Sequence, residues 1–373
     1  MPPTSLPTAG FDPVTPTPDP ARLPTDAAGS THLLQLGGLP PAAVRRLLER
    51  TRRVHTLMGE TASLPLSGPA QAPAGLRGLL KGRVVANLFF EDSTRTRVSF
   101  SVAARGLGAK VIDLTSVGSS VSKGESVADT AANVAAMGAD ALVIRHRASG
   151  ACHLVARTLA ALRPGRHFPA GRRCAVINAG DGRHEHPTQG LLDTYTLAEA
   201  HGRLDGFDLS GLTVAIVGDV AASRVARSDI AAMTALGARV VCVGPPSLVP
   251  ASLGALGCAL SNDLDAVLPD ADAVNVLRIQ FERREPPAGA THTPGPAAVV
   301  SLGEYARLYA LDADRLRTMK PGAIVMHPGP INRGVEITPE AADSPRSVVL
   351  RQVAHGVLVR MAVACECLGV SDF

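Results

Sequence analysis

A run of hydroxyl and guanidinium side chains at residues 91–97 follows an apolar segment of the sequence. The apolar segment, residues 83–90, reads RVVANLFF and predicts a buried β-strand, and the polar run begins a predicted helix. Short hydroxyls, an Arg fork and the N–H groups at a helix N-terminus can together bind a phosphate. The alternative is an ordinary Ser/Thr helix cap with solvated arginines. We interpret the string Ser-Thr-Arg-Thr-Arg at 93–97 as a phosphate site.

Two further polar side chains lie where predicted strands end. Arg145 closes the predicted strand 139–145, and His186 lies in the loop after the predicted strand 174–180. In open α/β sheets, ligands bind at the carboxyl ends of the strands. A surface arginine and a structural histidine are the alternatives. The charged residues after these strands therefore indicate a binding site at one edge of a sheet.

The short segment His184-Glu185-His186 raises the question of a metal site. Zinc sites use three or four ligands at recognisable spacings, and no third ligand accompanies this pair. The cysteines are scattered without a CxxC pair, which indicates reduced thiols and neither a zinc site nor a disulfide framework. They are Cys152, Cys174, Cys242, Cys258, Cys365 and Cys367. We therefore expect no metal and no cofactor.

Predicted strands and helices alternate along most of the chain. The strands form two sets, at 83–90, 109–114, 139–145 and 174–180, and then at 212–220, 238–244, 271–277 and 322–329. Such alternation predicts parallel sheets with right-handed crossovers. The fold class is therefore α/β, with two doubly wound parallel-sheet domains.

The domain division follows the composition. Residues 1–30 are rich in Pro, Thr, Ala and Asp and predict a disordered tail. Residues 31–200 are expected to form the first domain and residues 201–345 the second, after a polar break at 201–211. A final helix, within 346–373, is expected to pack back on the first domain.

Composition excludes several classes of function. The 373 residues are 46% hydrophobic, but only 3% are aromatic and Trp is absent, so the base-stacking platforms of nucleic-acid binders are missing. The net charge of +4 is spread without a basic run, which leaves small anionic substrates as partners. No segment has the length of a membrane span or the pattern of a signal peptide, so we expect a cytoplasmic protein that binds neither nucleic acid nor membrane.

From residue 89 onward, the sequence resembles the aspartate/ornithine carbamoyltransferase family, whose donor-binding signature reads like FFEDSTRTRVSF. Further matching segments follow in order across roughly residues 85–340. They are SSVSKGES (119–126), Arg145-His146, HPTQ (186–189), DVAASRVARS (219–228) with LRIQFER (277–283), and HPGPINRGVEI (327–337). The resemblance implies transfer of the carbamoyl group of carbamoyl phosphate to an amine, without metal or cofactor.

The resemblance also implies roles for the matching residues. Arg145 and His186 would polarise the carbonyl group as an oxyanion hole does, and Thr96 would lie near the same oxygen. With Arg95 they form the expected catalytic set, and no general base is needed if the departing phosphate takes the proton of the amine. The expected carbamoyl-phosphate ligands are Ser93, Thr94, Arg95, Thr96, Arg145, His186, Gln189, and the backbone around Pro328, Gly329 and Pro330.

The acceptor follows from cations at strand ends of the second domain. Arg224 begins the helix after the segment LTVAIVGDV, and Arg278 and Gln280 follow the predicted strand 271–277. Two guanidiniums suit a dicarboxylate. Ornithine-specific members instead use an acidic residue and a Ser-Met-Gly loop, with Cys in place of Pro328, and none of these is present. The expected acceptor is L-aspartate, and the product N-carbamoyl-L-aspartate belongs to an early step of de novo pyrimidine biosynthesis.

The family's assembly adds one expectation. The loop that matches SSVSKGES reaches across a subunit interface, so Ser119 and Lys123 are expected to come from the neighbouring chain of a homotrimer, with Lys123 binding aspartate. Regulatory or dihydroorotase-like partner chains stay open. Departures from the enteric pattern are Ser122, Val225, Gly329 and the insertion 332–334, and none removes a charged participant.

The sequence argues against three other classes of protein. VAIVGDV resembles the start of a dinucleotide-binding fold, but the residues after Gly218 lack the G-x-G-x-x-G pattern. A P-loop is absent. A catalytically silent assembly subunit is disfavoured because Arg95, His186 and Arg278 are intact.

Overall fold

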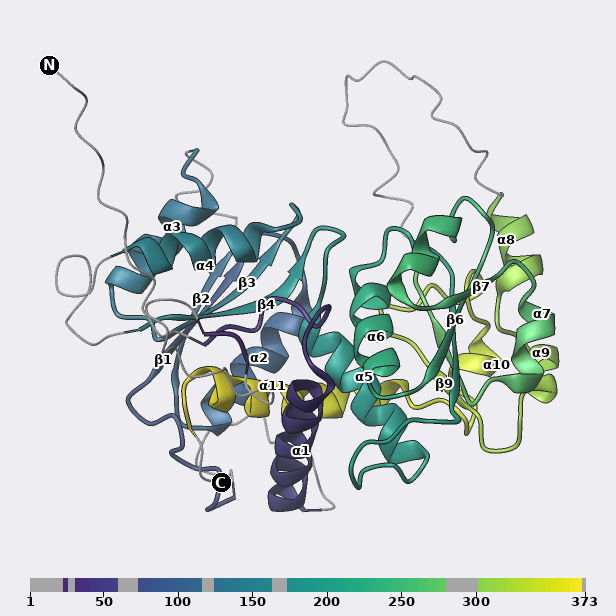
Figure 1. Cartoon of the computed structure of the whole chain (residues 1–373), viewed down its shortest axis with the longest axis horizontal. Coiled ribbons are helices and arrows are strands. Elements are labelled where there is room, and N and C mark those ends of the chain that lie inside the picture. The colour runs from purple at the N-terminus through teal and green to yellow at the C-terminus, as the bar shows by residue number, and fades with distance from the viewer. Residues whose placement is uncertain are drawn as a thin grey trace, which may run out of the picture.

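The computed structural model describes residues 23–25, 31–59, 73–115, 124–162, 173–279 and 301–370. They form two α/β lobes that lie side by side (Figure 1), each built around a parallel sheet. The predicted fold class is therefore confirmed. Most of the predicted N-terminal tail lies outside the described residues, although Leu23 is buried and Thr25 forms a β-bridge with Thr31.

The first sheet has the order β2-β1-β3-β4. Its strands are β1 (Val84–Phe89), β2 (Lys110–Thr115), β3 (Ala141–His146) and β4 (Ala175–Asp181). Both of its faces are covered, as a parallel sheet requires. Ala86 and Leu88 face a core shared with α3 (Val127–Ala136) and α4 (Ala151–Ala161), whereas Val85 and Phe89 face a core shared with α1 (Pro41–Met58) and α2 (Thr94–Gly106).

The second sheet has the order β7-β6-β5-β8-β9. Its strands are β5 (Thr213–Val217), β6 (Arg239–Val243), β7 (Ala259–Ser261), β8 (Ala273–Val276) and β9 (Ile324–Met326). The short edge strand β7 was not predicted. The α-helices of this lobe are α6 (Arg224–Ala235), α7 (Leu264–Val267), α8 (Leu302–Tyr309), α9 (Ala313–Thr318) and α10 (Pro339–Ala342).

Two helices join the lobes. Helix α5 (Pro187–Ala200) lies at the junction and packs on α6 and α11, and α11 (Val349–Cys367) returns beneath the first lobe to pack on α1 and α2 (Figure 1). Nearly every residue of α5 is buried, including Gln189 and Asp193. Buried polar side chains need internal partners, so this helix must carry its own hydrogen-bond network. Within the described part of the chain, no helix is both long and apolar enough to span a bilayer.

An ion pair fastens α11 to α1 and gives a test of this packing. The Nη1 atom of Arg50 lies 3.2 Å from Oε2 of Glu366, and each side chain is only 7% exposed. We expect Glu366→Ala to lower the free energy of unfolding by about 3 kcal/mol, because it leaves a buried guanidinium without its carboxylate. Urea unfolding measures the loss.

The double variant Arg50→Met/Glu366→Leu is the matched control. It replaces the two buried charges by apolar groups of similar size and leaves only the partly exposed Arg46, a second partner of Glu366, without its carboxylate, so it should regain most of the stability lost in the single variant. A single variant as stable as the wild type would contradict the buried pair.

Candidate active site

The N-terminus of α2 keeps its hydroxyl groups available for a ligand. Ser93 precedes the helix with an extended backbone, and its side chain makes no capping hydrogen bond. By contrast, Ser126 and Ser223 cap α3 and α6 by accepting bonds from Asp129 N and Ala226 N. Capping normally stabilises a helix start, so the hydroxyl of Ser93 is not used in the way that is usual at this position. This geometry supports the predicted phosphate site.

Arg95 of α2 lies against the loop that follows β9. Gly329 has a φ of +65°, and a Cβ atom at this position would overlap the guanidinium of Arg95. Only glycine permits both the left-handed backbone and so close an approach. The residue that departs from the enteric pattern therefore makes room for a predicted phosphate ligand, and it brings the 329–330 backbone to the start of α2.

His327 and Glu336 fix the same loop. Gly329 N donates to Nδ1 of His327 (2.7 Å), so the ring proton is on Nε2 and faces Oε1 of Glu336 at 3.2 Å. Asn332 N donates to the same carboxylate oxygen (2.6 Å). Burial lowers the pKa of His327, and the charges of Arg95 and Arg278 act in the same direction. Arg278 therefore lies near the same loop. The sequence analysis did not predict that His327 and Glu336 hold this loop in place.

Glu91 joins the two lobes through two predicted site residues. Its Oε1 atom accepts a hydrogen bond from Nη2 of Arg145 (2.9 Å), and its carboxylate forms a two-point ion pair with Arg224 of α6. The side chain of Arg224 is only 6% exposed, so this contact is shielded from water. Sequence reasoning missed Glu91. The available signal was a pair of acidic residues, Glu91 and Asp92, between a buried strand and the cationic run.

Gly180, near the end of β4, lets both arginines approach the backbone. Its φ is +111°, and a Cβ atom would lie 3.1 Å from Nη1 of Arg145 and 3.1 Å from Nε of Arg224. A larger residue would therefore strain the turn and displace both guanidiniums. Three predicted strand ends, those of β1, β3 and β4, thus meet α6 at one edge.

His186 precedes α5 and is buried beside the same cations. Burial lowers its pKa well below the ordinary value, and the charges of Arg145, Arg360 and Arg224 lower it further, so the ring is neutral. Its backbone N–H donates to Ser228 Oγ (3.0 Å), whereas its Nδ1 atom has no hydrogen-bond partner among the described residues. A buried ring nitrogen without a protein partner suits an imidazole that hydrogen-bonds to a ligand.

The other predicted residues divide into two groups. Gln189 lies one turn into α5, where its Nε2 donates to Oδ1 of Asp193 (3.0 Å). Ser119, Lys123 and Gln280 lie outside the described residues, so their predicted roles stay predictions.

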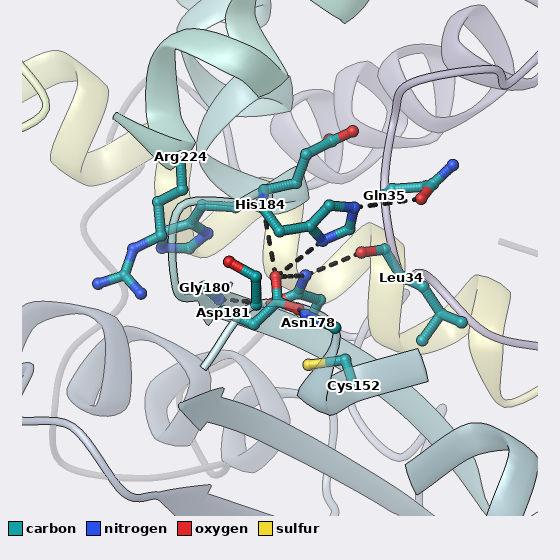
Figure 2. Close-up of polar contacts among 12 residues, drawn as sticks. Leu34, Gln35, Cys152, Asn178, Gly180, Asp181, His184 and Arg224 are labelled. Atoms are coloured by element: carbon teal, nitrogen blue, oxygen red, sulfur yellow. Dashed lines mark hydrogen bonds and ion pairs between the residues drawn. The ribbon is translucent and has the colours of Figure 1, made fainter. Parts of the chain in front are cut away.

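Figure 2 shows the polar contacts around Asp181. These contacts include the hydrogen-bond partners of both ring nitrogens of His184. Oδ1 of Asp181 accepts from His184 Nδ1 (2.9 Å). Gln35 donates its amide to Gly37 O (2.7 Å), which turns its Oε1 toward His184 Nε2 at 3.2 Å. Both ring nitrogens face acceptors, which favours the charged ring, and the bond to Asp181 raises the pKa of His184.

These hydrogen bonds bear on the metal question. His153, Asp181 and His184 have ligand atoms within 4.8 Å of one another, but Asp181 and His184 already hydrogen-bond to each other. Glu185, between the two histidines of the suspected motif, accepts from Leu36 N (2.7 Å) and Gly37 N (2.9 Å). These groups already have structural partners.

A second group of potential ligands joins α1, α5 and α11. His55, Glu199 and His355 also have ligand atoms within 4.8 Å of one another. Nδ1 of His55 is bonded to the Tyr195 hydroxyl (2.8 Å), and Glu199 pairs with Arg351 at 3.4 Å. The positive charge of Arg351 disfavours a metal cation nearby, so this group fits an ion-pair cluster better than a metal centre.

Two family profiles match the chain. The profile "Aspartate/ornithine carbamoyltransferase, carbamoyl-P binding domain" matches residues 31–199, and the profile "Aspartate/ornithine carbamoyltransferase, Asp/Orn binding domain" matches residues 210–367. The chain therefore belongs to the aspartate/ornithine carbamoyltransferase family, which confirms the resemblance.

Similar curated proteins are aspartate carbamoyltransferase catalytic subunits. That of Myxococcus xanthus is 51% identical over 336 residues, which cover 90% of this chain and 99% of the relative. That of Salinispora arenicola is 48% identical over 342 residues, which cover 91% of this chain and 98% of the relative.

Solved structures with this fold include both acceptor types. Aspartate transcarbamoylase from Trypanosoma cruzi, in complex with carbamoyl phosphate and aspartate, has a TM-score of 0.69 at 26% identity, covering 91% of this chain and 96% of that chain. Ornithine carbamoyltransferase from Pyrococcus furiosus also has a TM-score of 0.69 at 26% identity, covering 92% and 99%. Backbone similarity therefore does not choose the acceptor, and the choice depends on side chains.

The pairing of His184 predicts a pH dependence of stability. Its native pKa lies above the unfolded value of about 6.5, so its contribution is complete below about pH 6.5 and is lost as the pH rises through the native pKa. We expect His184→Gln to lose more unfolding free energy at pH 6 than at pH 9, as measured by urea titration. His153→Gln is the control, because burial lowers the pKa of His153 and reverses the sign. Identical pH responses of the two variants would exclude a charged His184.

Proposed function

We propose that this enzyme transfers the carbamoyl group of carbamoyl phosphate to the amino group of L-aspartate, giving N-carbamoyl-L-aspartate and phosphate. This reaction is an early step of de novo pyrimidine biosynthesis. The observation that carries the proposal is the joining of Arg145 and Arg224 by Glu91 beside the buried His186. Arg145, which is assigned to the carbamoyl donor, and Arg224, which is assigned to the amine acceptor, thus lie at the same edge of the first sheet.

The donor half of the site would act by charge stabilisation. Ser93, Thr94, Arg95 and Thr96 bind the phosphate, and the neutral His186 and the cation Arg145 stabilise the charge that develops on the carbonyl oxygen. Gln189 and the backbone at Gly329 and Pro330 bind the NH2 group. The amine nitrogen attacks the carbonyl carbon, the bond from that carbon to the phosphate oxygen breaks, and the departing phosphate takes the proton of the amine.

The acceptor half would bind the two carboxylates of aspartate. Arg224 and Arg278 supply paired guanidiniums, and Gln280 follows Arg278 by two positions in the sequence. In the structure Glu91 pairs with Arg224. A substrate carboxylate at Arg224 therefore has to compete with an internal carboxylate, which couples acceptor binding to the contact between the lobes.

The division of labour follows the two sheets. We propose that residues 31–200, completed by the helix within 346–373, bind carbamoyl phosphate and that residues 201–345 bind aspartate. The assembly would be a homotrimer in which Ser119 and Lys123 enter the neighbouring chain's site. Regulatory or dihydroorotase-like chains would be the further partners in a larger assembly. The proposed location is the cytoplasm.

An acceptor panel tests the reaction. Purified enzyme with carbamoyl phosphate should release phosphate with L-aspartate and not with ornithine. Arg278→Ala should raise the Michaelis constant for aspartate and lose roughly 2–5 kcal/mol of transition-state stabilisation, because a desolvated carboxylate loses its paired charge. Comparable turnover of ornithine would refute the acceptor, and a change below about tenfold in Arg278→Ala would refute the role of that residue.

A mixing experiment tests the shared site. Lys123→Ala and Arg95→Ala should each be nearly inactive. A site is intact only when its own chain keeps Arg95 and its neighbour keeps Lys123, so dissociation, equal mixing and reassociation should restore about one quarter of wild-type sites in a closed trimer. Both variants must be shown to be folded, and a mass tag must confirm chain exchange. Verified hybrids that stay inactive would refute sharing.

A further inference from the structure

Two aspartates meet in the buried seam between the lobes. Asp193 of α5 and Asp229 of α6 are each fully buried, and the charge of Asp193 adds to burial in raising the pKa of Asp229. Oδ2 of Asp193 and Oδ1 of Asp229 have no hydrogen-bond partner among the described residues. Two buried carboxyl groups whose charges act on one another are not both ionised, so the pair holds one proton.

The other oxygen of Asp193 sets the orientation of two amides. Oδ1 accepts from Nε2 of Gln189 (3.0 Å) and from Nε2 of Gln352 on α11 (2.6 Å). An amide that donates through nitrogen to a carboxylate turns its oxygen the other way. The Oε1 atoms of both glutamines are thereby directed away from Asp193 as acceptors.

The second amide extends this orientation to the loop after β9. Oε1 of Gln352 accepts from His327 N (2.9 Å), and Nδ1 of His327 accepts from Gly329 N (2.7 Å). If Gln352 were flipped, its NH2 group would face another N–H donor, and the loop would lose its support. The carboxylate of Asp193 therefore orients both groups that are proposed to bind the carbamoyl NH2. These groups are Gln189 and the 329–330 backbone.

We propose that Asp193 and Asp229 are positioning residues, which share one proton and orient the acceptors that distinguish a carbamoyl NH2 group from other substituents. This inference rests on the donor site proposed above. Neither aspartate touches the substrate in this assignment. Asp193 supplies the fixed acceptor, and Asp229 supplies the proton that lets a second carboxyl group lie against it.

The surrounding charges suit a pair that keeps one negative charge. Arg360 of α11 is buried, and its charge acts on Asp193, whereas Cys242 of β6 lies near Asp229. Burial raises the pKa of Asp193 to about 7 and that of Asp229 well above its ordinary value. Asn275 donates to Oδ2 of Asp229 (2.8 Å), which holds that carboxyl in the second lobe.

Two donors that differ in one group test the proposal. Carbamoyl phosphate and acetyl phosphate carry NH2 and CH3 at the same position, so the ratio of their dissociation constants reports recognition of the NH2 group. Titration calorimetry of the full-length enzyme without aspartate should give a wild-type ratio of about tenfold or more, because an NH2 group satisfies buried acceptors that a methyl group leaves unpaired. Inorganic phosphate is the third probe and reports the phosphate site alone.

Asp193→Leu should reduce this ratio to within about threefold of unity while leaving phosphate affinity near the wild-type value. Asp193→Asn should restore the ratio, because its Oδ1 can accept from both glutamines and its NH2 can donate to Asp229. Thr194→Val is the matched control. It removes a buried hydroxyl from the next residue of α5, which donates a hydrogen bond to Gly190 O (2.7 Å), and it should keep the wild-type ratio.

The shared proton gives a second readout. Loss of this proton at alkaline pH leaves two adjacent carboxylates, so the wild-type ratio should fall as the pH is raised above neutrality. Asp229→Asn carries a donor that does not titrate, and its ratio should stay level. For stability, a native pKa above the unfolded value of about 4 means that wild type loses stability relative to Asp229→Asn as the pH rises from there. Parallel pH profiles of the two proteins would refute the shared proton.

The outcomes separate this inference from the proposed function. A wild type that binds both acyl phosphates equally refutes the donor site and the inference together. A discriminating wild type whose folded Asp193→Leu variant discriminates equally, or weakens all three probes alike, refutes the positioning role alone. If Asp193→Leu does not fold, Gln352→Met cuts the link to His327 without altering Gln189, and an unchanged ratio in that variant overturns the proposal.

Discussion

The geometry of the site depends on the contacts that the carboxylate of Glu91 makes with two arginines. This carboxylate is a single negative charge between Arg145 of the first lobe and Arg224 of the second. Without it, two guanidiniums that both approach Gly180 would repel one another in a poorly hydrated place. The strand ends of one sheet and the first turn of α6 can meet because this charge lies between them.

The packing around α5, between the lobes, is stabilised differently from the cores of the two sheets. The sheets are stabilised by burial of Val, Leu, Ile and Ala, which needs no directional bonds. Helix α5 instead buries Gln189, Asp193 and Thr196 among apolar neighbours. Each such group must find a partner of the right polarity, so the seam tolerates fewer arrangements than the cores on either side.

The sequence predicted what depends on local pattern. Apolar runs located the strands of both sheets except β7, whose three residues at a sheet edge carry little signal. The run from Ser93 to Arg97 was recognisable because strand, hydroxyls and helix start are adjacent in the chain.

Contacts between distant segments were not predictable in the same way. Asp193 is the one charged residue in LLDTYTL, and nothing local indicates that Asp229 lies near it. Glu91 lies 133 positions from Arg224, and Glu336 supports a histidine whose other neighbours include Arg95 of α2 and Gln352 of α11. Such groups become visible only when the fold brings them together.

The path of the chain between the lobes has a mechanical consequence. The polypeptide leaves the first lobe between α5 and β5 and returns between β9 and α11 (Figure 1). A body tethered at one point can swivel in any direction, whereas two tethers define an axis. Rotation about the line through these two crossings is therefore the relative displacement that would lengthen neither connection, whereas sliding of one lobe along the other would stretch one of them.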